Sequence, residues 1–336
     1  FSSRRRHTRY GTVTGVQTCA LPIFVVDREL ERATAVPECA PTLQAALDNW
    51  ADTAPKLDAV YQSLNAGTRE GFSLDVSALS APLSRAFQWL DGSSYLTHVE
   101  RARKARGVEM PPSFLNDPLM YQGASDNLLG PRDPISVASE EWGLDFEAEV
   151  AVVTDDVPMG VTPARAAEHT KLLMLVNDIS LRNLIPPELA KGFGFVQGKP
   201  ASAFSPVAVT PDELGEAWKD NRVRLPLRTH LNGQLFGNPN AGEDMQFDFA
   251  ILISHASKTR HLCAGTIIGS GTVSNADRNC GCACIIEQRA LEIVDRGEAI
   301  TPFMRYGDKV HIEMLDAFGK TIFGAIEQVV QPYHCP

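Results

Sequence analysis

The pattern of apolar and polar positions divides the chain into a helical beginning and a strand-rich remainder. Between Phe24 and Ser80 most of the pattern is helical, above all in APTLQAALDNWADTAPKLDAVYQSLNAG. This run ends on Gly67, and glycine commonly follows the last turn of a helix. The segment from Pro111 to Pro134 is rich in proline and glycine, which predicts a loop.

Two hairpins and two helices are predicted in the strand-rich part. Asn232-Gly233 lies between strand-like arms in VRLPLRTHLNGQLFG, and Asn-Gly is a strong signal for a two-residue hairpin turn. KVHIEMLDAFGKTIFGAIEQVV predicts a second hairpin that turns at about residues 317–319. Helices are expected over residues 162–173, with Pro163 in the first turn, and over residues 247–257.

These elements predict an α+β fold that is mainly β. A small, partly helical N-terminal region would cover residues 24–80, and a larger domain would cover residues 81–332. We expect residues 1–23 to be foreign to this fold. They contain four arginines and no acid, resemble translated sequencing-adapter read-through, and form no amphipathic helix that would favour a transit peptide.

The stretch LDFEAEVAVV, from Leu144 to Val153, predicts a strand with an unusual acidic face. Side chains two residues apart lie on the same side of a strand, so Asp145, Glu147 and Glu149 share one face. Adjacent carboxylates repel one another and are costly to bury. Either water or a positive group must therefore cover that face.

Composition and charge exclude several classes of partner. A chain of 336 residues can bury a sizeable core, and it contains no apolar run of transmembrane length. The net charge of −10 argues against nucleic acid or an anionic membrane as the main partner. Seven cysteines in such a long chain predict a reduced, cytoplasmic protein; the Cys280/Cys282/Cys284 cluster lacks a fourth ligand with good metal-site spacing.

Carboxylates in three separate segments suggest a divalent cation. Asp178 ends an apolar strand in LLMLVNDISLRN, and Asp91 precedes His98 in QWLDGSSYLTHVERARKARG. Together with the acidic strand they would supply hard oxygen ligands, which suit Mg²⁺ or Ca²⁺ better than Zn²⁺. Spacing leaves ordinary alternatives open, because Asp178 also suits a turn and His98 also suits an exposed helix surface.

Five motifs occur in one order along the chain. They are Asp91 with His98, Glu147-x-Glu149, Asn177-Asp178-x-Ser180-x-Arg182, Gly198-Lys199, and Gly271-Thr272-Val273-Ser274 with Glu287 downstream. In this order, over about residues 40–330, they resemble the fumarylacetoacetate hydrolase family, in particular its compact bacterial members. The resemblance implies the family's mixed β-sandwich roll, with a small N-terminal region, and a homodimer.

The resemblance also implies roles for individual residues. A divalent cation, Mg²⁺ or Ca²⁺ with Mn²⁺ also possible, would be held by Asp91, Glu147, Glu149 and Asp178. His98 would be the general base, Glu287 would orient its ring, and Lys199 would place positive charge beside the leaving enolate. The substrate would be contacted by Arg106, Tyr121, Thr272 and Arg182, with Arg182 also pairing with Asp178.

The implied reaction is metal-dependent hydrolysis of a carbon–carbon bond in a 1,3-diketo acid. Fumarylacetoacetate, cleaved to fumarate and acetoacetate in tyrosine and phenylalanine breakdown, is the expected substrate. Such cleavage needs an electron sink, which the diketone supplies as an enolate. Ser93 and Ile185 replace a Tyr and a Gln that face the substrate in long family members, so the substrate is less well supported than the metal and base residues.

Other activities remain open. Relatives on the same fold cleave acylpyruvates, decarboxylate oxaloacetate, or isomerise and hydrate unsaturated keto acids, and a catalytically silent metal-binding protein is a further alternative. No G-x-S-x-G motif is present, which excludes a serine hydrolase elbow. GFGFVQGKP fits neither nucleotide-binding glycine spacing, because it has G-x-G-x-x-x-G and Pro200 after Lys199.

Removal of residues 1–23 should leave the melting temperature and the activity nearly unchanged, because these residues are expected to lie outside the fold. Thermal unfolding and diketo-acid cleavage by residues 24–336 and by the full chain would check this. A large loss of either quantity would show that the segment is structural.

Overall fold

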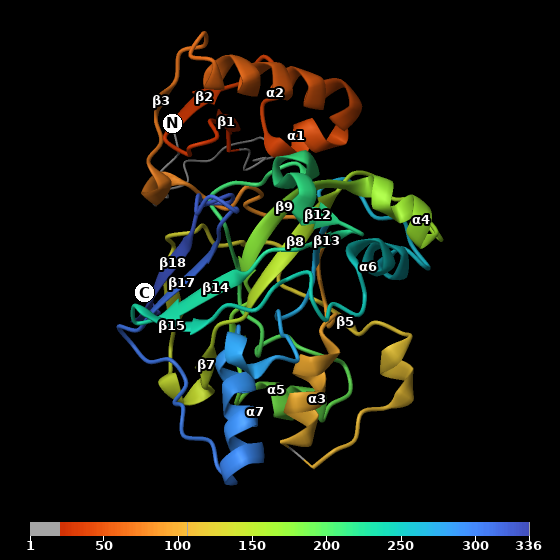
Figure 1. Cartoon of the computed structure of the whole chain (residues 1–336), viewed down its shortest axis with the longest axis vertical. Coiled ribbons are helices and arrows are strands. Elements are labelled where there is room, and N and C mark those ends of the chain that lie inside the picture. Colours follow the sequence, from red (N-terminus) through yellow and green to blue (C-terminus); the bar gives the residue numbers. More distant parts are fainter. Residues whose placement is uncertain (1–20, 106, 336) are drawn as a thin grey trace.

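The computed structural model describes residues 21–105 and 107–335, and its centre is a six-stranded sheet (Figure 1). The strand order is β11-β9-β8-β16-β4-β5. In that order the strands span Ala203–Phe204, Thr170–Asn177, Ala148–Thr154, Ile267–Gly269, Trp89–Gly92 and Met120–Gln122. Neighbouring strands are antiparallel except β16 and β4, which are parallel.

A five-stranded sheet packs against one face of the first. Its order is β15-β14-β17-β18-β6, with strands at Gln234–Gly237, Leu227–Leu231, Lys309–Met314, Ile326–Pro332 and Ile135–Val137. Both predicted hairpins are confirmed: β14 pairs with β15, and β17 pairs with β18. Asn232 and Gly233 have φ values of 53° and 79°, which the Asn-Gly pair tolerates well.

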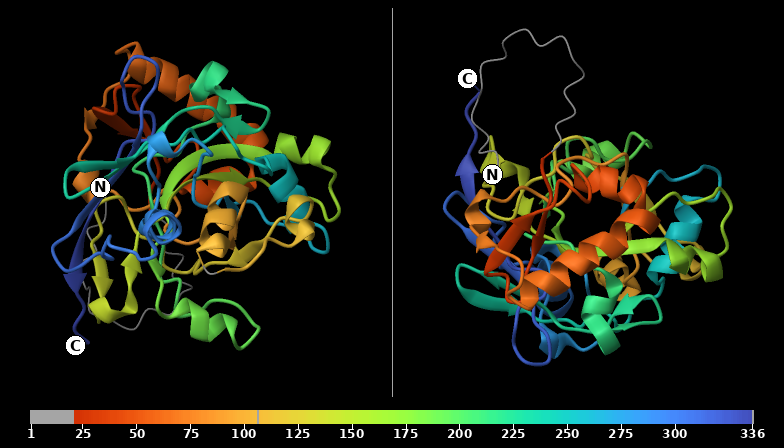
Figure 2. Two further views of the ribbon diagram at one scale, coloured as in Figure 1. Left: turned by 60° about the horizontal axis from the view of Figure 1, so that its bottom comes forward. Right: turned by 90° about the horizontal axis from the view of Figure 1, so that it is seen from above.

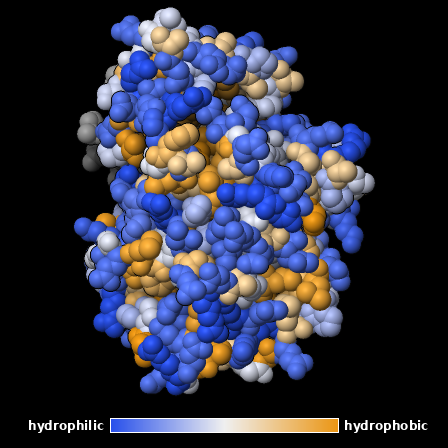
Figure 3. Space-filling view, in the orientation of Figure 1, coloured by the Kyte–Doolittle hydropathy of each residue, from blue (hydrophilic) through white to orange (hydrophobic). Residues whose placement is uncertain are grey.

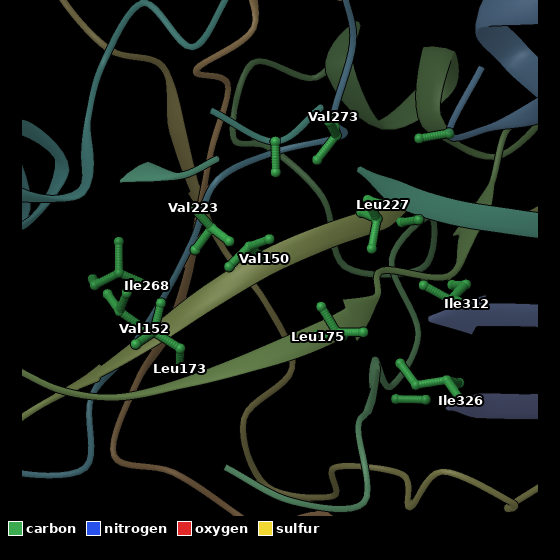
Figure 4. Close-up of a cluster of buried hydrophobic side chains, with 14 of the residues drawn as sticks. Val150, Val152, Leu173, Leu175, Val223, Leu227, Ile268, Val273, Ile312 and Ile326 are labelled. Atoms are coloured by element: carbon green, nitrogen blue, oxygen red, sulfur yellow. The ribbon is translucent and has the colours of Figure 1, made fainter. Parts of the chain in front are cut away.

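The main core lies between these two sheets (Figure 4). Val150 and Val152 of β8 face it together with Leu173 of β9, and Leu227 and Ile312 approach from the other sheet. The intervening residues of β8, such as Ala151, belong to a second apolar cluster on the opposite face. Strand β8 is therefore buried on both sides, which explains its continuous apolar sequence.

The N-terminal region covers that opposite face. Helices α1 (Leu43–Asp48) and α2 (Trp50–Asn65) lie over one end of the six-stranded sheet (Figures 1 and 2), and Leu47 enters the second apolar cluster. A small sheet of β1 (Phe24–Val26), β2 (Arg32–Ala35) and β3 (Phe72–Ser73) completes the region. A cavity of about 660 Å³ lies between this region and the main body, and no predicted site residue is among those that line it.

The remaining elements surround the sheets. The helices are α3 (Leu96–Lys104), α4 (Pro163–Ala166), α5 (Ile185–Leu189), α6 (Phe249–Ala256) and α7 (Ile285–Arg296). Two-stranded pairs join β7 (Leu144–Asp145) to β10 (Ser180–Leu181) and β12 (Trp218–Lys219) to β13 (Arg222–Val223). Single 3₁₀ turns occur at Val76–Ala78, Pro112–Leu115, Glu140–Trp142, Ala167–His169 and Arg278–Cys280, and a longer 3₁₀ segment spans Pro211–Ala217.

Local predictions were confirmed where one physical signal dominated. Helix α6 lies within the predicted segment and is capped by Asp248, whose side chain accepts a hydrogen bond from Ile251 N at 3.0 Å. The helix predicted over residues 162–173 is wrong in length, because the chain enters β9 at Thr170. The predicted loop at residues 111–134 contains β5, and the N-terminal region contains three strands that the helical pattern hid.

The fold class is confirmed: helices and strands combine in two curled sheets around a shared core. The view in Figure 3 shows a mostly hydrophilic surface with apolar side chains in scattered groups. Among the described residues, no helix combines the length and apolar character needed to cross a membrane. The foreign segment expected at residues 1–23 lies mostly outside the described residues, which begin at residue 21.

Leu173→Ala should lower the free energy of unfolding by about 2–5 kcal/mol, because Leu173 is fully buried between the sheets and truncation leaves a cavity. Urea denaturation would measure the change. Leu235→Ala is the matched control, since Leu235 is 62% exposed and its loss should change stability by no more than about 0.5 kcal/mol. Similar effects of the two substitutions would contradict this account of the core.

Candidate metal centre and catalytic site

Three buried carboxylates meet at one end of the six-stranded sheet. Asp91, Glu149 and Asp178 each offer an oxygen, and these three oxygens lie within 4.8 Å of one another. Asp91 is on β4, Glu149 is on β8, and Asp178 directly follows β9. All three are among the four ligands that the family resemblance implied, and the sheet register brings them together.

Strand register and the alternation of side chains explain why the carboxylates of Asp91 and Glu149 lie close together. Gly269 on β16 lies between Ala151 of β8 and Asp91 of β4. Glu149 is two residues from Ala151, so it faces the same side of the sheet. A Cβ atom at Gly269 would lie 2.4 Å from Asp91 Oδ1, so only glycine leaves room for this carboxylate. Gly271 N then donates a hydrogen bond to the same oxygen at 3.0 Å.

The Glu149 carboxylate is the feature that most favours a cation. Both of its oxygens are buried, and neither accepts a hydrogen bond from an N–H or hydroxyl group among the described residues. The carboxyl of Asp91 lies within hydrogen-bonding reach. Burial, together with the charges of Asp91 and Asp178, raises the pKa of Glu149 well above its usual range. A buried carboxylate without donors needs either a proton or a cation, and the all-oxygen set around it fits Mg²⁺ or Ca²⁺.

Asp178 is held by three donors. Lys199 Nζ donates to Asp178 Oδ2 at 2.6 Å, Tyr121 Oη donates to the same oxygen at 2.6 Å, and Ser202 Oγ donates to Oδ1 at 2.7 Å. Burial would lower the pKa of Lys199, but the charges of Asp178 and Glu147 outweigh it and raise that pKa. Lys199 is therefore a fixed positive charge inside the site.

Glu147 lies apart from the three-carboxylate group. Its Oε1 accepts hydrogen bonds from Arg182 Nη2 at 2.6 Å and Thr272 Oγ1 at 2.8 Å, and its Oε2 accepts from Lys199 and Ser180. Arg182 pairs with Glu147 and Asp145, so the expected pairing of Arg182 with Asp178 is wrong for the side-chain arrangement seen here. A ligand role for Glu147 stays a prediction.

Asp145 has a different task from its two acidic neighbours. Its carboxylate accepts hydrogen bonds from Ile285 N at 2.7 Å and Ile286 N at 2.9 Å, the first backbone amides of α7. Cys284, the N-cap residue of that helix, makes no capping bond of its own. Asp145, on strand β7, thus caps α7, and its negative charge stabilises the N-terminal, positive end of the helix dipole.

His98 and Glu287 form a pair beside the carboxylates. The His98 ring on α3 contacts Glu287 on α7, with 2.7 Å between Nδ1 and Oε2, and α3 lies beside α7 in Figures 1 and 2. Burial would raise the pKa of Glu287, but His98 and Arg101 outweigh it and hold that pKa below its usual value. Glu287 is therefore ionised, and its carboxylate accepts a hydrogen bond from His98 Nδ1.

Arg101 is a site residue that the sequence reasoning missed. Its guanidinium bonds Glu287 Oε1 and also donates to Ser274 Oγ at 3.2 Å and to Asn275 O at 2.7 Å. Ser274 Oγ in turn donates to Glu287 Oε1 at 2.8 Å. Arg101 lies three residues after His98 on α3, a spacing that places both on one helix face and could have pointed to it.

The remaining predictions concern the substrate-binding residues and the cysteine cluster. Tyr121 and Thr272 are in the site, where both donate to its carboxylates. Arg106 lies outside the described residues. All three cysteines of the cluster are free thiols, and Cys284 approaches His98 and Glu147.

Two family profiles together match most of the chain. The family profile described as fumarylacetoacetate (FAA) hydrolase C-terminal matches residues 88–331, and fumarylacetoacetase N-terminal domain 2 matches residues 22–85. The chain belongs to the fumarylacetoacetate hydrolase family. The resemblance seen in the five motifs is thereby confirmed.

Solved structures of the fumarylacetoacetate hydrolase fold resemble this chain at low sequence identity. A fumarylacetoacetate hydrolase from Exiguobacterium antarcticum matches with a TM-score of 0.63 and 19% identity, covering 94% of this chain and 97% of that one. A probable 2-hydroxyhepta-2,4-diene-1,7-dioate isomerase from Mycobacterium abscessus matches with a TM-score of 0.62 and 20% identity, covering 91% and 93%. Both likenesses show a shared fold.

Curated relatives of the family match over part of their length. An oxaloacetate tautomerase from Xenopus laevis mitochondria is 28% identical over 185 residues, 54% of this chain and 53% of that protein. A Burkholderia lata protein, named only as a candidate hydrolase, is 28% identical over 184 residues, 54% of this chain and 59% of that protein. The chain thus spans little more than half the length of these relatives.

Mg²⁺ should raise the melting temperature more at about pH 8 than at about pH 6. In the metal-free protein, burial and the charge of Asp178 raise the pKa of Asp91 to about 8, and that of Glu149 is also raised. Stability from such carboxyls is present while they are protonated and is lost as the pH rises from their unfolded toward their folded pKa. The metal replaces those protons, so its effect grows with pH.

Differential scanning calorimetry with Mg²⁺ and with EDTA at the two pH values would measure this. Glu149→Gln, which removes one charged ligand but keeps the side-chain size, should abolish most of the Mg²⁺ effect. Equal Mg²⁺ effects at both pH values, or in both proteins, would contradict a metal site at these carboxylates.

Proposed function

We propose that this chain is a metal-dependent hydrolase that cleaves a carbon–carbon bond in a 1,3-diketo acid, with fumarylacetoacetate as the first candidate substrate. The observation that carries the proposal is the His98–Glu287 pair beside the buried carboxylates. Hydrolysis needs a group that takes a proton from water, and a neutral imidazole backed by an ionised carboxylate is suited to that task. We further propose a homodimer as the functional form.

His98 is the proposed general base. The Glu287 carboxylate accepts a hydrogen bond from Nδ1–H, which leaves the lone pair of Nε2 free to take a proton from water. The imidazolium that forms is stabilised by the negative charge of Glu287. Arg101 and Ser274 hold the other side of this carboxylate, so they act as positioning residues for the base.

Lys199 is the proposed electrostatic partner of the leaving group. The oxygen of water bonds to the attacked carbonyl carbon, the adjacent carbon–carbon bond breaks, and its electron pair passes to the departing ketone as an enolate. Lys199 stays protonated, so it would stabilise the developing negative charge without itself losing a proton. The proton that His98 took from water is then delivered to the enolate carbon, so the products are a carboxylic acid and a ketone and His98 is neutral again.

A divalent cation held by Asp91, Glu149 and Asp178, with Glu147 as a further candidate, would polarise the diketone oxygens when bound. Mg²⁺ or Ca²⁺ fits the oxygen donors, and Mn²⁺ is also compatible. Arg106 is proposed to bind a substrate carboxylate through its planar guanidinium. Tyr121, Thr272 and Arg182 donate to the site's own carboxylates, so we propose that they shape the substrate pocket chiefly by fixing those groups.

Keto–enol conversion of a keto acid is a second candidate. It uses a base and a polarised carbonyl but consumes no water, and the names of an oxaloacetate tautomerase and of an isomerase among the similar proteins support testing it. The same residues would serve either reaction. The fate of the substrate's carbon–carbon bond distinguishes the two.

His98→Gln should lower kcat for diketone cleavage by about 10²–10⁴-fold, because it removes the proton acceptor. His255→Gln is a matched control on α6, away from the carboxylates, and should keep full activity. Loss of diketone absorbance would be followed for fumarylacetoacetate and a short acylpyruvate, with Mg²⁺ and with EDTA. Enolisation of oxaloacetate would be followed in parallel.

Cleavage that needs both the metal and His98 supports the hydrolase. Enolisation without any cleavage would replace it with the tautomerase. Metal binding with neither reaction would leave a catalytically silent metal-binding protein.

A further inference from the structure

A second group of metal-ligating side chains lies on the outer face of the five-stranded sheet. It consists of His230 on β14 with His311 and Glu313 on β17, and one ligand atom from each lies within 4.8 Å of the other two. Strands β14 and β17 lie side by side in this sheet (Figure 1). The catalytic carboxylates belong to the other sheet, so this group is separate from the candidate active site.

The strand register brings these residues together. His230 and His311 are direct cross-strand partners, and Glu313 is two residues after His311, on the same face of β17. Their neighbours Thr229 and Ile312 are buried and face the core. The three side chains therefore project from the side of the sheet that faces away from the core.

His311 is oriented as metal-ligating histidines commonly are. Its Nδ1 contacts Glu327 Oε1 at 3.0 Å, and Glu327 is itself paired with Arg132 at 2.8 Å. A carboxylate behind one ring nitrogen fixes the tautomer and leaves the other nitrogen as the ligand. That other nitrogen, Nε2, lies 3.5 Å from Glu313 Oε2, close to the roughly 3.3 Å spacing of ligand atoms around a tetrahedral Zn²⁺.

His230 provides an independent indication. Its Nδ1 is buried and has no hydrogen-bond partner anywhere in the described part of the chain. Its ring centroid is 5.4 Å from that of His311, with the planes at 82°. Two imidazoles and one carboxylate are the donors that Zn²⁺ and similar transition metals prefer, in contrast to the all-oxygen catalytic group.

We propose that His230, His311 and Glu313 bind a transition-metal ion of the Zn²⁺ class. The side chains of His311 and Glu313 are 29% and 20% exposed, so solvent can reach the site and fill a fourth position. An ion there joins β14 to β17 across their register and stabilises the folded chain. Arg228 is the cross-strand neighbour of Glu313 and lies on the same face of the sheet.

Calorimetric titration with ZnCl₂ at pH 7.5, in excess Mg²⁺ to fill the catalytic site, tests the proposal. The full chain should bind Zn²⁺ with a matching rise in melting temperature. His311→Gln, His230→Gln and Glu313→Gln should each weaken one binding event by at least about tenfold, and Glu327→Gln should weaken it less. His255→Gln is the matched control and should bind Zn²⁺ as the unmodified chain does.

Two results would overturn the proposal. One is an unchanged number and affinity of Zn²⁺ ions in all three ligand variants, which would assign the binding to thiols or to the catalytic group. The other is the absence of saturable Zn²⁺ binding in the unmodified chain. Circular dichroism of each variant ensures that lost binding does not reflect lost folding, and His311→Gln is the safer replacement than Glu313→Gln because the His311 side chain is the more exposed of the two. Diketone cleavage by the variants should remain unchanged, so this test is independent of the proposed hydrolysis.

Discussion

The buried negative charge at the end of the six-stranded sheet is the constraint on which the site depends. Asp91, Asp145, Glu147, Glu149 and Asp178 are all at most 6% exposed. Ionised groups are stable in such surroundings only when donors or opposite charges compensate them. Lys199 and Arg182 compensate part of this charge, and Asp145 also binds the amides of α7. The charge of Glu149 has no such compensation from a donor or cation among the described residues, so its position defines where a cation fits.

The sequence alone was enough to predict much of the fold. Asn232-Gly233 and the apolar alternation of β17 and β18 are local signals, and both hairpins formed as expected. Thr170 to Leu173 was misassigned, because a strand buried on both faces is continuously apolar and cannot be distinguished from a buried helix by periodicity. The pairing of β16 with both β4 and β8 depends on contacts far apart in the sequence, and no local pattern encodes it.

The site was likewise predictable only as far as local sequence signals reach. Carboxylates at strand ends are visible in a sequence, and the order of the motifs indicated the family. The hydrogen-bond and ion-pair partners of these residues could not be read from the sequence. Asp145 looked like a third member of an acidic face, but the strand breaks after it and its side chain turns to a helix. Arg101 looked like one charge in a basic run, although its partners come from residues more than 170 positions away.

The segment from Asp145 to Glu149 performs three tasks in five residues: it caps α7, pairs with the fixed cations and supplies the orphan carboxylate. Side chains in β8 alternate between faces, so one residue inserted or deleted at its start would move Glu149 relative to the rest of the strand. A change between Asp145 and Ala148 would shift β7 relative to β8. The helix that carries Glu287, the charge on Lys199 and the cation position would then be lost together. A single substitution in this short stretch therefore removes one of the three contributions, whereas a change in its length removes all three.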